Sequence, residues 1–455
     1  MQGEAIVKRF TRRETIQIGG AGALAGAGLL GSAGRRSLSA QGIPIADVQP
    51  PDLPIEDGAT LRVLRPSKFV AADERVWLEN TAKFVEETGV DVRVDFESWE
   101  DLRPKTAVAA NVGQGPDIIV AWSDDPHQFP DKTLDLTDVA TYLGEKYGGW
   151  WPLAEKYGTG GGDKWISMPI GGSGGRVVYR KSWTDEAGFS EIPQDPAGFL
   201  ELCRKLNETG HPAGLALGNA VGDANAWCHW LVWAHGGAMV DENDQVIINS
   251  PETVEALKYG QELYKTFIPG TEAWLDPSNN KAFLSGQLGL TQNGISIYYA
   301  ALNSEEEQVR QLAEDIHHAR MPIGPAGQPT ERSLIVNAMV MNYTPYPNAA
   351  KEYLRFMMEE PQYHVWLQEC IGYWNHPLQA YDASPVWEDP KHQPFKHVIK
   401  DSLWDGYRGS LGEESAAVLA EFVMVNMVAS VCTGQLNPEE AAAEAERRAK
   451  RYYRS

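Results

Sequence analysis

The sequence predicts an α/β protein, because short apolar runs alternate with stretches of helical periodicity. The first such unit has an apolar run at 61–64, a helical pattern over 76–88 that stops at a glycine, and strand-like alternation over 90–96. The run 117–122 is apolar after its first residue, as in a strand buried on both faces. We therefore expect strand–helix–strand units and a parallel sheet.

The same alternation continues to the C-terminus. About 415 residues follow residue 40, too many for one core and enough for two lobes of roughly 200 residues each. The further elements that we expect are helices at 102–111, 196–208, 223–235, 251–267, 349–360, 413–432 and 438–454, and strands at 177–179, 288–291 and 334–342.

The first 40 residues predict an export signal. Lys8, Arg9, Arg12 and Arg13 precede an uncharged stretch rich in Gly and Ala over 16–30. This stretch is shorter than the roughly 17 to 25 apolar residues of a typical membrane-spanning helix. The adjacent arginines resemble the twin-arginine export motif, with a partial match in the residues that follow them. We expect an exported protein.

Cleavage after Ala40 would leave a soluble chain that begins with a tether. Residues 41–58 hold four prolines and little periodicity. The signal carries six basic and two acidic residues, so its removal changes the net charge from −22 to about −26. Such a charge repels nucleic acid and anionic lipid. Past Ala40 we expect no further membrane span.

A GxSxG motif at 171–175 could mark a hydrolase nucleophile. That motif needs a strand before the serine and a helix directly after it. A strand-like run over 176–180 follows here instead. We interpret the glycines as a flexible segment that crosses between lobes.

The histidines and cysteines give no metal or cofactor signature. His317 and His318 are adjacent, and adjacent side chains point in different directions, so they do not make a ligand pair. We expect no cofactor and no metal. The cysteines form no CxxC and are interpreted as ordinary buried residues, although a disulfide stays possible. They are Cys203, Cys228, Cys370 and Cys432.

The 15 tryptophans are the most informative feature for function. Trp99 follows one predicted strand, Trp122 ends another, and Trp374 lies in a turn beside Asn375. Ligands of open α/β sheets gather beyond the carboxyl ends of the strands. Aromatic faces stack on sugar rings, and nearby Asp, Asn and Ser oxygens bind hydroxyls. The pattern favours a carbohydrate ligand.

A secreted carbohydrate-active enzyme is the alternative. Such an enzyme needs two carboxylates roughly 5 to 10 Å apart, and Asp124 with Asp125, or Glu97 with Glu100, are candidate pairs. Sequence spacing does not give that distance, and most of the 62 acidic residues are expected on the solvated surface.

Four stretches, at 99–119, 164–181, 233–257 and 283–294, cover most of the mature chain in a characteristic order. Together they resemble family 1 extracellular solute-binding proteins, the periplasmic receptors of ABC importers related to maltose-binding protein. The resemblance implies a two-lobed periplasmic-binding-protein fold of the Venus flytrap kind, type II-like, with three hinge crossings. It also implies a periplasmic monomer that closes on a sugar, oligosaccharide or polyol and delivers it to the transmembrane subunits of a permease, without catalysis.

The same resemblance gives expected lobe boundaries. Candidate crossings lie at 170–174, 291–294 and 342–348. Lobe 1 would then contain 59–170 plus 295–342, and lobe 2 would contain 175–290 plus 349–455. All four cysteines would fall in lobe 2, where an intralobe bridge would be possible.

Ligand contacts follow by position from the resemblance. Asp124 and Asn293 would orient hydroxyls, and Trp122 and Trp374 would stack on the ligand. The usual aromatic residue after Asn-Gly is replaced by Ile295 and Ser296, which alters that wall of the expected pocket. The implied contacts are Ser67, Lys68, Trp99, Trp122, Ser123, Asp124, Ser173, Asn225, Trp227, Asn293, Arg332, Trp374 and Asn375.

Overall fold

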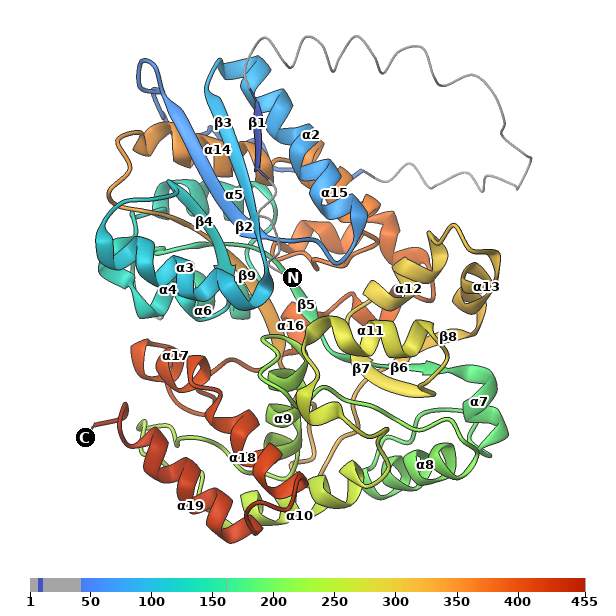
Figure 1. Cartoon of the computed structure of the whole chain (residues 1–455). Helices are drawn as coiled ribbons and strands as arrows, with labels where there is room; N and C mark the ends of the chain where they lie inside the picture. The colour runs from blue at the N-terminus through green and yellow to red at the C-terminus, as the bar shows by residue number, and fades with distance from the viewer. Residues whose placement is uncertain (1–6, 11–41, 161, 455) are drawn as a thin grey trace.

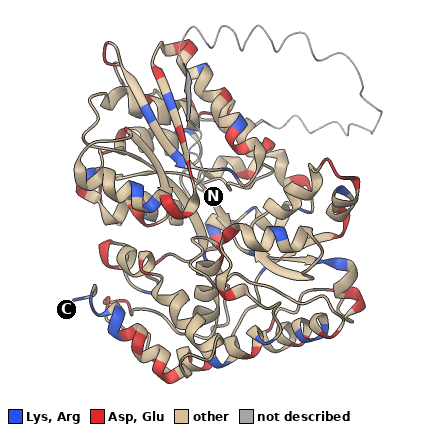
Figure 2. Ribbon diagram, in the orientation of Figure 1, with Lys and Arg blue, Asp and Glu red and all other residues tan. Residues whose placement is uncertain are grey.

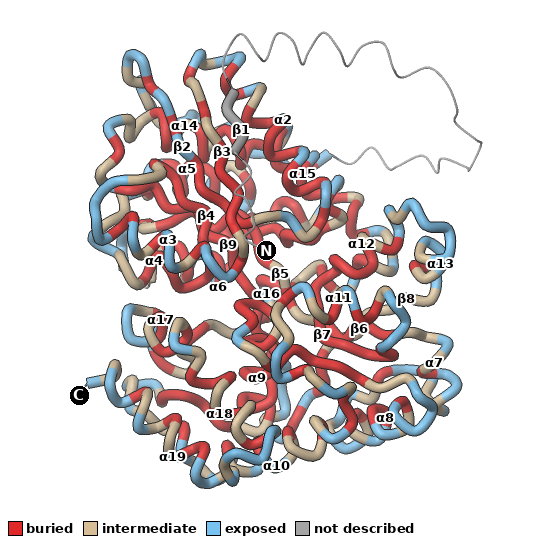
Figure 3. Tube along the Cα trace, viewed as in Figure 1, coloured by how far each residue is buried: buried red, intermediate tan, exposed pale blue. Residues whose placement is uncertain are grey.

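A computed structural model describes residues 7–10, 42–160 and 162–454. The expected twin-arginine pair Arg12-Arg13 and the cleavage site at Ala40 lie outside the described residues. Figure 1 shows two lobes, one above the other, and Figure 2 shows both acidic and basic residues spread over the surface of each. Two clusters of buried apolar side chains form the cores, and buried segments follow the strands in Figure 3.

The first lobe is built on a six-stranded sheet of order β1-β3-β2-β4-β9-β5. β2 is parallel to both β3 and β4, whereas β9 is antiparallel to β4 and β5. The expected parallel sheet is therefore mixed. The strands are β1 (Val7–Phe10), β2 (Thr60–Pro66), β3 (Asp91–Glu97), β4 (Ile118–Trp122), β5 (Met168–Gly174) and β9 (Ser333–Val340).

Two helices of this lobe have local signals at their termini, and the end of α2 at Gly89 is the one that the sequence predicts. α2 ends at Gly89, whose φ of 77° is in the left-handed region that glycine adopts readily. α3 begins after Ser98, whose side chain accepts a hydrogen bond from the Asp101 N–H. The helices are α2 (Ala71–Thr88), α3 (Trp99–Val112), α4 (Asp125–Gln128), α5 (Thr137–Lys146), α6 (Pro152–Thr159), α14 (Pro347–Met358), α15 (Glu360–Glu369) and α16 (Val398–Asp401).

The second lobe holds a three-stranded antiparallel sheet of order β7-β6-β8. Its strands are β6 (Arg176–Arg180), β7 (Leu290–Asn293) and β8 (Ile316–Ala319). Its helices are α7 (Lys181–Glu186), α8 (Pro196–Glu208), α9 (Asp223–Ala234), α10 (Pro251–Tyr264), α11 (Asp276–Leu284), α12 (Ser296–Leu302), α13 (Glu307–Asp315), α17 (Glu413–Ala420), α18 (Val423–Cys432) and α19 (Pro438–Ala449).

Each predicted strand and helix is present with shifted ends, except that the predicted helix 413–432 is divided into α17 and α18, and two of the expected crossings are wrong. β7 is followed by α12, α13 and β8, and β8 pairs with β6, so 295–319 belongs to the second lobe rather than the first. The segment 342–348 leads from β9 into α14, which packs against α2 and α5 in the first lobe. Its prolines begin a helix rather than form a hinge.

The chain of the described residues crosses between the lobes in three places. The first crossing lies between β5 and β6 and directly follows the expected segment 170–174, which is itself part of β5. The second lies between β8 and β9, and the third between α16 and α17. Because 349–401 stays in the first lobe, Cys370 is separated from the other three cysteines, and all four thiols are free.

The glycines of the first crossing serve close packing rather than flexibility. A Cβ on Gly171 would lie 2.8 Å from Trp374, and one on Gly174 would lie 2.3 Å from Val398. Both residues are buried in β5, which is hydrogen-bonded to β9. β6 follows Ser173, so the helix that a nucleophile elbow requires is absent at this place.

The segments on either side of the expected cleavage site contact the first lobe. β1 pairs antiparallel with β3, and removal of a signal after Ala40 would leave β3 as the sheet edge. The expected tether is not free either: Ile43 is buried, and the Glu56 carboxylate accepts from the backbone N–H of Asn348 and Ala349. Val48, Leu53 and Ile55 of the same segment also pack against the buried apolar cluster, which explains why the segment is held.

One stretch of the described residues, Glu413–Cys432, is long and apolar enough to cross a membrane by length and composition alone, contrary to our expectation. The structure divides it into α17 and α18 at Phe422, whose φ is 52°. α18 packs against α9, α10 and α19, and most of the stretch is buried. The packing of a core helix explains this composition.

Candidate functional site

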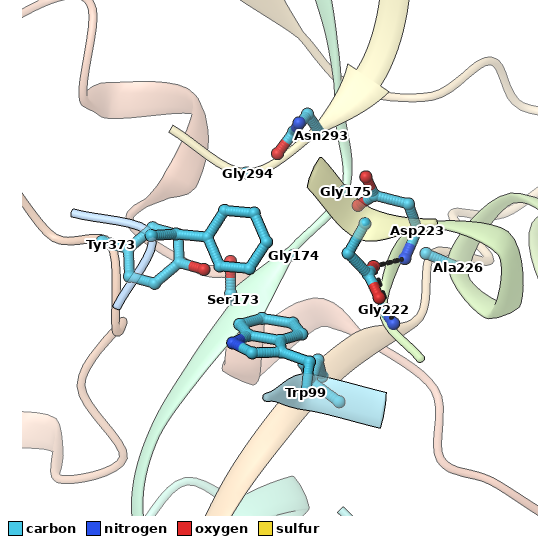
Figure 4. Close-up of a pocket in the computed structure, with 13 residues that line it drawn as sticks. Trp99, Ser173, Gly174, Gly175, Gly222, Asp223, Ala226, Asn293, Gly294 and Tyr373 are labelled. Carbon is cyan, nitrogen blue, oxygen red and sulfur yellow. Dashed lines mark hydrogen bonds between the residues drawn. The ribbon is translucent and has the colours of Figure 1, made fainter. Parts of the chain in front are cut away.

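A small cavity, partly open to solvent, lies between the two lobes. Trp99, Tyr373, Asn293 and Asp223 face this space from different elements (Figure 4). The complete lining is Phe69, Trp99, Ser173, Gly174, Gly175, Gly222, Asp223, Ala226, Asp276, Asn293, Gly294, Leu334 and Tyr373.

Trp99 forms an aromatic wall from the first lobe. It is the first residue of α3, and its indole Nε1 donates to the Ser67 carbonyl at 2.9 Å. The ring packs on Trp122 behind it, with centroids 4.5 Å apart. Phe69 meets Trp99 edge to face at 4.5 Å and stacks beside Tyr373 at 6.5 Å. The wall is therefore held in place before any ligand arrives.

The opposite wall comes from the first turn of α9 in the second lobe. A Cβ on Gly222 would lie 3.5 Å from the Trp99 ring and 3.6 Å from Leu334, so the lobes touch here. Asp276, at the start of α11, accepts hydrogen bonds from the backbone N–H groups of Val221, Gly222 and Asp223 at 2.8 to 3.0 Å. This places the Asp223 side chain at the cavity.

Polar groups from the first crossing and from the end of β7 complete the lining. The Asn293 amide donates to the side-chain oxygens of Asn279 and Asn280, and its own oxygen accepts from Ser296. Ser173 lies beside Gly294: a Cβ added to Gly294 would lie 2.6 Å from the Ser173 Oγ. The cavity thus combines aromatic faces with hydroxyl, amide and carboxylate oxygens, a set suited to a small polyhydroxylated ligand.

Burial changes the acidity of the two carboxylates. Burial raises the pKa of Asp276 to about 6, against the lowering effect of its three backbone donors. Burial and the neighbouring Asp276 charge raise the pKa of Asp223 well above its usual value. Asp223 is half-buried and accepts one hydrogen bond, from the Asn279 amide at 2.7 Å.

Three of the expected contacts, Trp99, Ser173 and Asn293, are brought together at the cavity. The first-strand loop reaches it through Phe69, while Ser67 contributes its carbonyl to Trp99 and Lys68 pairs with Glu74 at 2.8 Å. The sequence located this loop but not the side chain that points inward.

Several other expected contacts lie behind the wall. Trp122 is fully buried and donates from its indole to the Trp99 carbonyl. The Ser123 hydroxyl joins β4 to β9 through Ile335. Trp374 is stacked 6.2 Å from Trp99, with Tyr373 rather than Trp374 at the cavity.

Two expected contacts have structural partners that account for their burial. The Asn375 amide donates to the carbonyls of Phe395 and Lys396. Trp227 lies in the core of the second lobe and donates to the Ala216 carbonyl at 2.6 Å.

Asp124 and Arg332 belong to a buried charge network instead. Asp124 pairs with Arg103 at 2.9 Å, and Arg332 pairs with Asp405 at 2.5 Å. Burial raises the pKa of Asp124 despite Arg103. Each of the two has one buried polar atom without a hydrogen-bond partner, namely Asp124 Oδ2 and Arg332 Nη1.

A second small cavity is lined in part by Asn225, His229 and Asp405. The Asn225 side-chain oxygen has no hydrogen-bond partner, and burial lowers the pKa of His229 to about 4. Asn225 is therefore the one expected contact that faces this cavity rather than the first.

Ten of the thirteen lining residues were not among the expected contacts, and four of these have aromatic or acidic side chains: Phe69, Asp223, Asp276 and Tyr373. Asp223 was already the first residue of a predicted helix, and Phe69 and Tyr373 each adjoin an expected contact. The sequence around Asp276 gave no sign of a role at the site, because its carboxylate reaches the cavity through a hydrogen bond from Gly222, which is 54 residues away in the sequence. Among the described residues no group of three or more His, Cys, Asp or Glu could hold a metal ion.

Comparison with known proteins identifies relatives of this architecture. Residues 80–394 match the model of a family described as bacterial extracellular solute-binding protein. A "Probable ABC transporter-binding protein" of Deinococcus radiodurans is 23% identical over 208 residues, which are 43% of this chain and 48% of the relative, so the match spans about half of that protein.

Solved structures extend the likeness to the whole fold. Maltose-bound MalE3 of T. maritima is 19% identical with a TM-score of 0.74, covering 86% of this chain and 99% of that one. A ribitol complex of an ABC transporter solute-binding protein from Agrobacterium radiobacter K84 is 18% identical with a TM-score of 0.72, covering 87% and 99%. The matched residues 80–394 include both lobes and most of the cavity wall, and the chain belongs to the bacterial extracellular solute-binding protein family.

Proposed function

We propose that this protein is the extracytoplasmic substrate-binding component of an ABC importer. It would capture a small polyhydroxylated solute, a sugar, oligosaccharide or polyol, between its lobes and present the closed form to the transmembrane subunits of a permease. The observation that carries the proposal is the cavity between the lobes, with Trp99 on one wall and Asp223 on the other.

The composition of the cavity supports a polyhydroxylated ligand. Trp99, Phe69 and Tyr373 offer apolar faces to the C–H face of a sugar or polyol, while Ser173 and Asn293 offer hydrogen bonds to hydroxyls. Relatives with the same fold hold maltose and ribitol, which have this mixed character. Contacts from both lobes would stabilise the closed form over the open one.

The remaining parts of the proposal follow from the family and the sequence. The export signal would deliver the chain to the periplasm as a monomer, and a permease would be its protein partner. The first lobe would contain 59–174 with 333–401, and the second 176–319 with 413–454. We propose no catalytic residues and no cofactor.

If the protein were a glycosidase instead, Asp223 and Asp276 would be the carboxylate pair in the cavity. Asp276 is already bound by three backbone N–H groups, so it is poorly placed to exchange a proton with a substrate. Formation of product from oligosaccharides, abolished by Asp223→Asn, would nevertheless establish the enzyme in place of the receptor.

The test is calorimetry and thermal shift with a panel of monosaccharides, disaccharides and polyols. A bound solute must raise the unfolding temperature, because it stabilises only the folded state. The variant Trp99→Leu keeps an apolar contact with Trp122 but loses the ring, and we expect affinity to fall by about 5- to 30-fold, from about 1 to 2 kcal/mol of lost stacking. A panel without a single binder contradicts the proposal.

Trp183→Leu is the matched control. Trp183 is partly buried and its ring stacks on that of His211 at 3.8 Å, and neither Trp183 nor His211 lines the cavity. Equal losses of affinity in both variants would show that Trp99 acts through general stability rather than through the ligand.

A further inference from the structure

The two carboxylates at the cavity differ from most buried carboxylates of the described chain in having no basic partner. Asp73 pairs with Arg65 at 2.7 Å, Asp405 with Arg332 at 2.5 Å, and Glu331 with Arg176 at 3.1 Å. No Lys, Arg or His lines the cavity that holds Asp223 and Asp276. A buried negative charge without such a partner is costly, so the cavity favours something that compensates it.

The two carboxylates are compensated to different degrees. Asp276 receives three backbone N–H donors at the start of α9, where the helix dipole also favours a negative charge. Asp223 receives one amide hydrogen bond, from Asn279, and its other oxygen is free to bind a ligand. The negative charge with the fewest compensating partners at the site is therefore that of Asp223.

The surroundings of Asp223 suit a cation more than a neutral hydroxyl. Phe69, Trp99 and Tyr373 present aromatic rings to the same space, and aromatic faces attract ammonium groups. Lys68 is the basic side chain closest in sequence to this wall, and it is held by Glu74 at 2.8 Å. The protein itself thus leaves the cation to be supplied by the ligand.

We propose that the solute carries a protonated amino group, as in an amino sugar or an amino polyol, and that Asp223 is its partner. The hydroxyls of the same solute would bind Ser173 and Asn293, with the carbon skeleton on Trp99. This inference rests on the proposed function and specifies the ligand class of that site.

The acidity of the pair gives the site a pH dependence. The groups that act on Asp223 are Asp276 of α11, which raises its pKa, and the Asn279 amide, which lowers it. An ammonium group binds the deprotonated form, so its affinity should fall as the pH is lowered through the raised pKa of Asp223. Below about pH 6 the Asp276 carboxyl also gains a proton, which weakens the field further.

The experiment is calorimetry at pH 7 with ligands that share a skeleton and differ in charge. The probes are D-glucosamine, N-acetyl-D-glucosamine and D-glucose, the corresponding β-1,4-linked disaccharides, and glucamine with sorbitol. We expect the ammonium member of at least one set to bind at least about tenfold more tightly than its neutral partners, the usual effect of a charge-assisted hydrogen bond.

Asp223→Asn should abolish that preference, because the amide that replaces the carboxylate offers no negative charge to an ammonium group. Asp131→Asn, the same change at an exposed carboxylate outside the cavity, should leave it intact. Neutral members that bind as tightly as the ammonium ones, or an Asp223→Asn variant that keeps the preference, would overturn the inference and leave the proposed function standing. Failure of every probe, together with the wider panel, would overturn the proposed function.

Discussion

Gly222 offers a direct test of closure, because it lies where the second lobe meets Trp99 and Leu334 of the first lobe at the cavity. A Cβ there would lie 3.0 Å from the Asp276 carboxylate within its own lobe, and 3.5 and 3.6 Å from Trp99 and Leu334 across the cavity. The latter two distances are ordinary contacts, so Gly222→Ala disturbs only the second lobe. Gly222→Val adds methyl groups that reach about 1.5 Å beyond Cβ, into the space that Trp99 and Leu334 occupy.

Overpacking of this kind costs about 1 to 3 kcal/mol, which corresponds to a Kd about 5- to 150-fold weaker. Because the open form separates Trp99 and Leu334 from Gly222, the loss should fall on the bound state rather than on the free protein. Calorimetry should show a much larger loss of affinity for Gly222→Val than for Gly222→Ala, with similar ligand-free unfolding temperatures. Equal affinities of the two variants would refute the idea that the lobes meet at Gly222 when the ligand is bound.

Three further predictions concern stability and export. Arg332→Met leaves Asp405 buried without its partner and should lower the free energy of unfolding by about 3 to 5 kcal/mol in urea titrations; an unchanged midpoint would contradict the buried pair. Burial lowers the pKa of His127 to about 4, so between pH 6.5 and 4 the unfolded chain binds the proton and the folded chain does not. Wild type should therefore lose stability relative to His127→Gln across that window, and a constant difference would be evidence against the buried neutral imidazole. Replacing Arg12 and Arg13 by Lys should block export, measured by fractionation, whereas unchanged secretion would reduce the signal to an ordinary one.

The sequence predicted the strands and helices well because each has its own local signal. Hydrophobic periodicity, with Gly89 as a C-cap, marks the first β-α-β unit without knowledge of the fold. The short strand β8, which contains two adjacent histidines, has no comparable pattern. Its pairing with β6 joins segments far apart in the sequence, and missing it displaced the second crossing. The third crossing was displaced because the prolines of 342–348 were interpreted as a hinge, whereas they begin α14.

The candidate site was predicted to the level of the loop rather than the side chain. Trp99 was found because a tryptophan directly after a strand is unusual. Trp122 and Trp374 follow the same rule, yet they support Trp99 from behind. Tertiary packing decides which side chains of a loop point into the cavity. The hydrophobic periodicity of the sequence carries no information about that packing. Asp276 reaches the site only through backbone contacts with a helix distant in sequence.

The most direct test of the central claim is a crystal structure of the protein with the solute that copurifies with it or with a binder from the panel. We predict electron density in the cavity between the lobes, with a carbon skeleton on Trp99 and a hydrogen bond to Asp223. Density in the second cavity, beside Asn225 and His229, with the Trp99 cavity empty, would contradict the account.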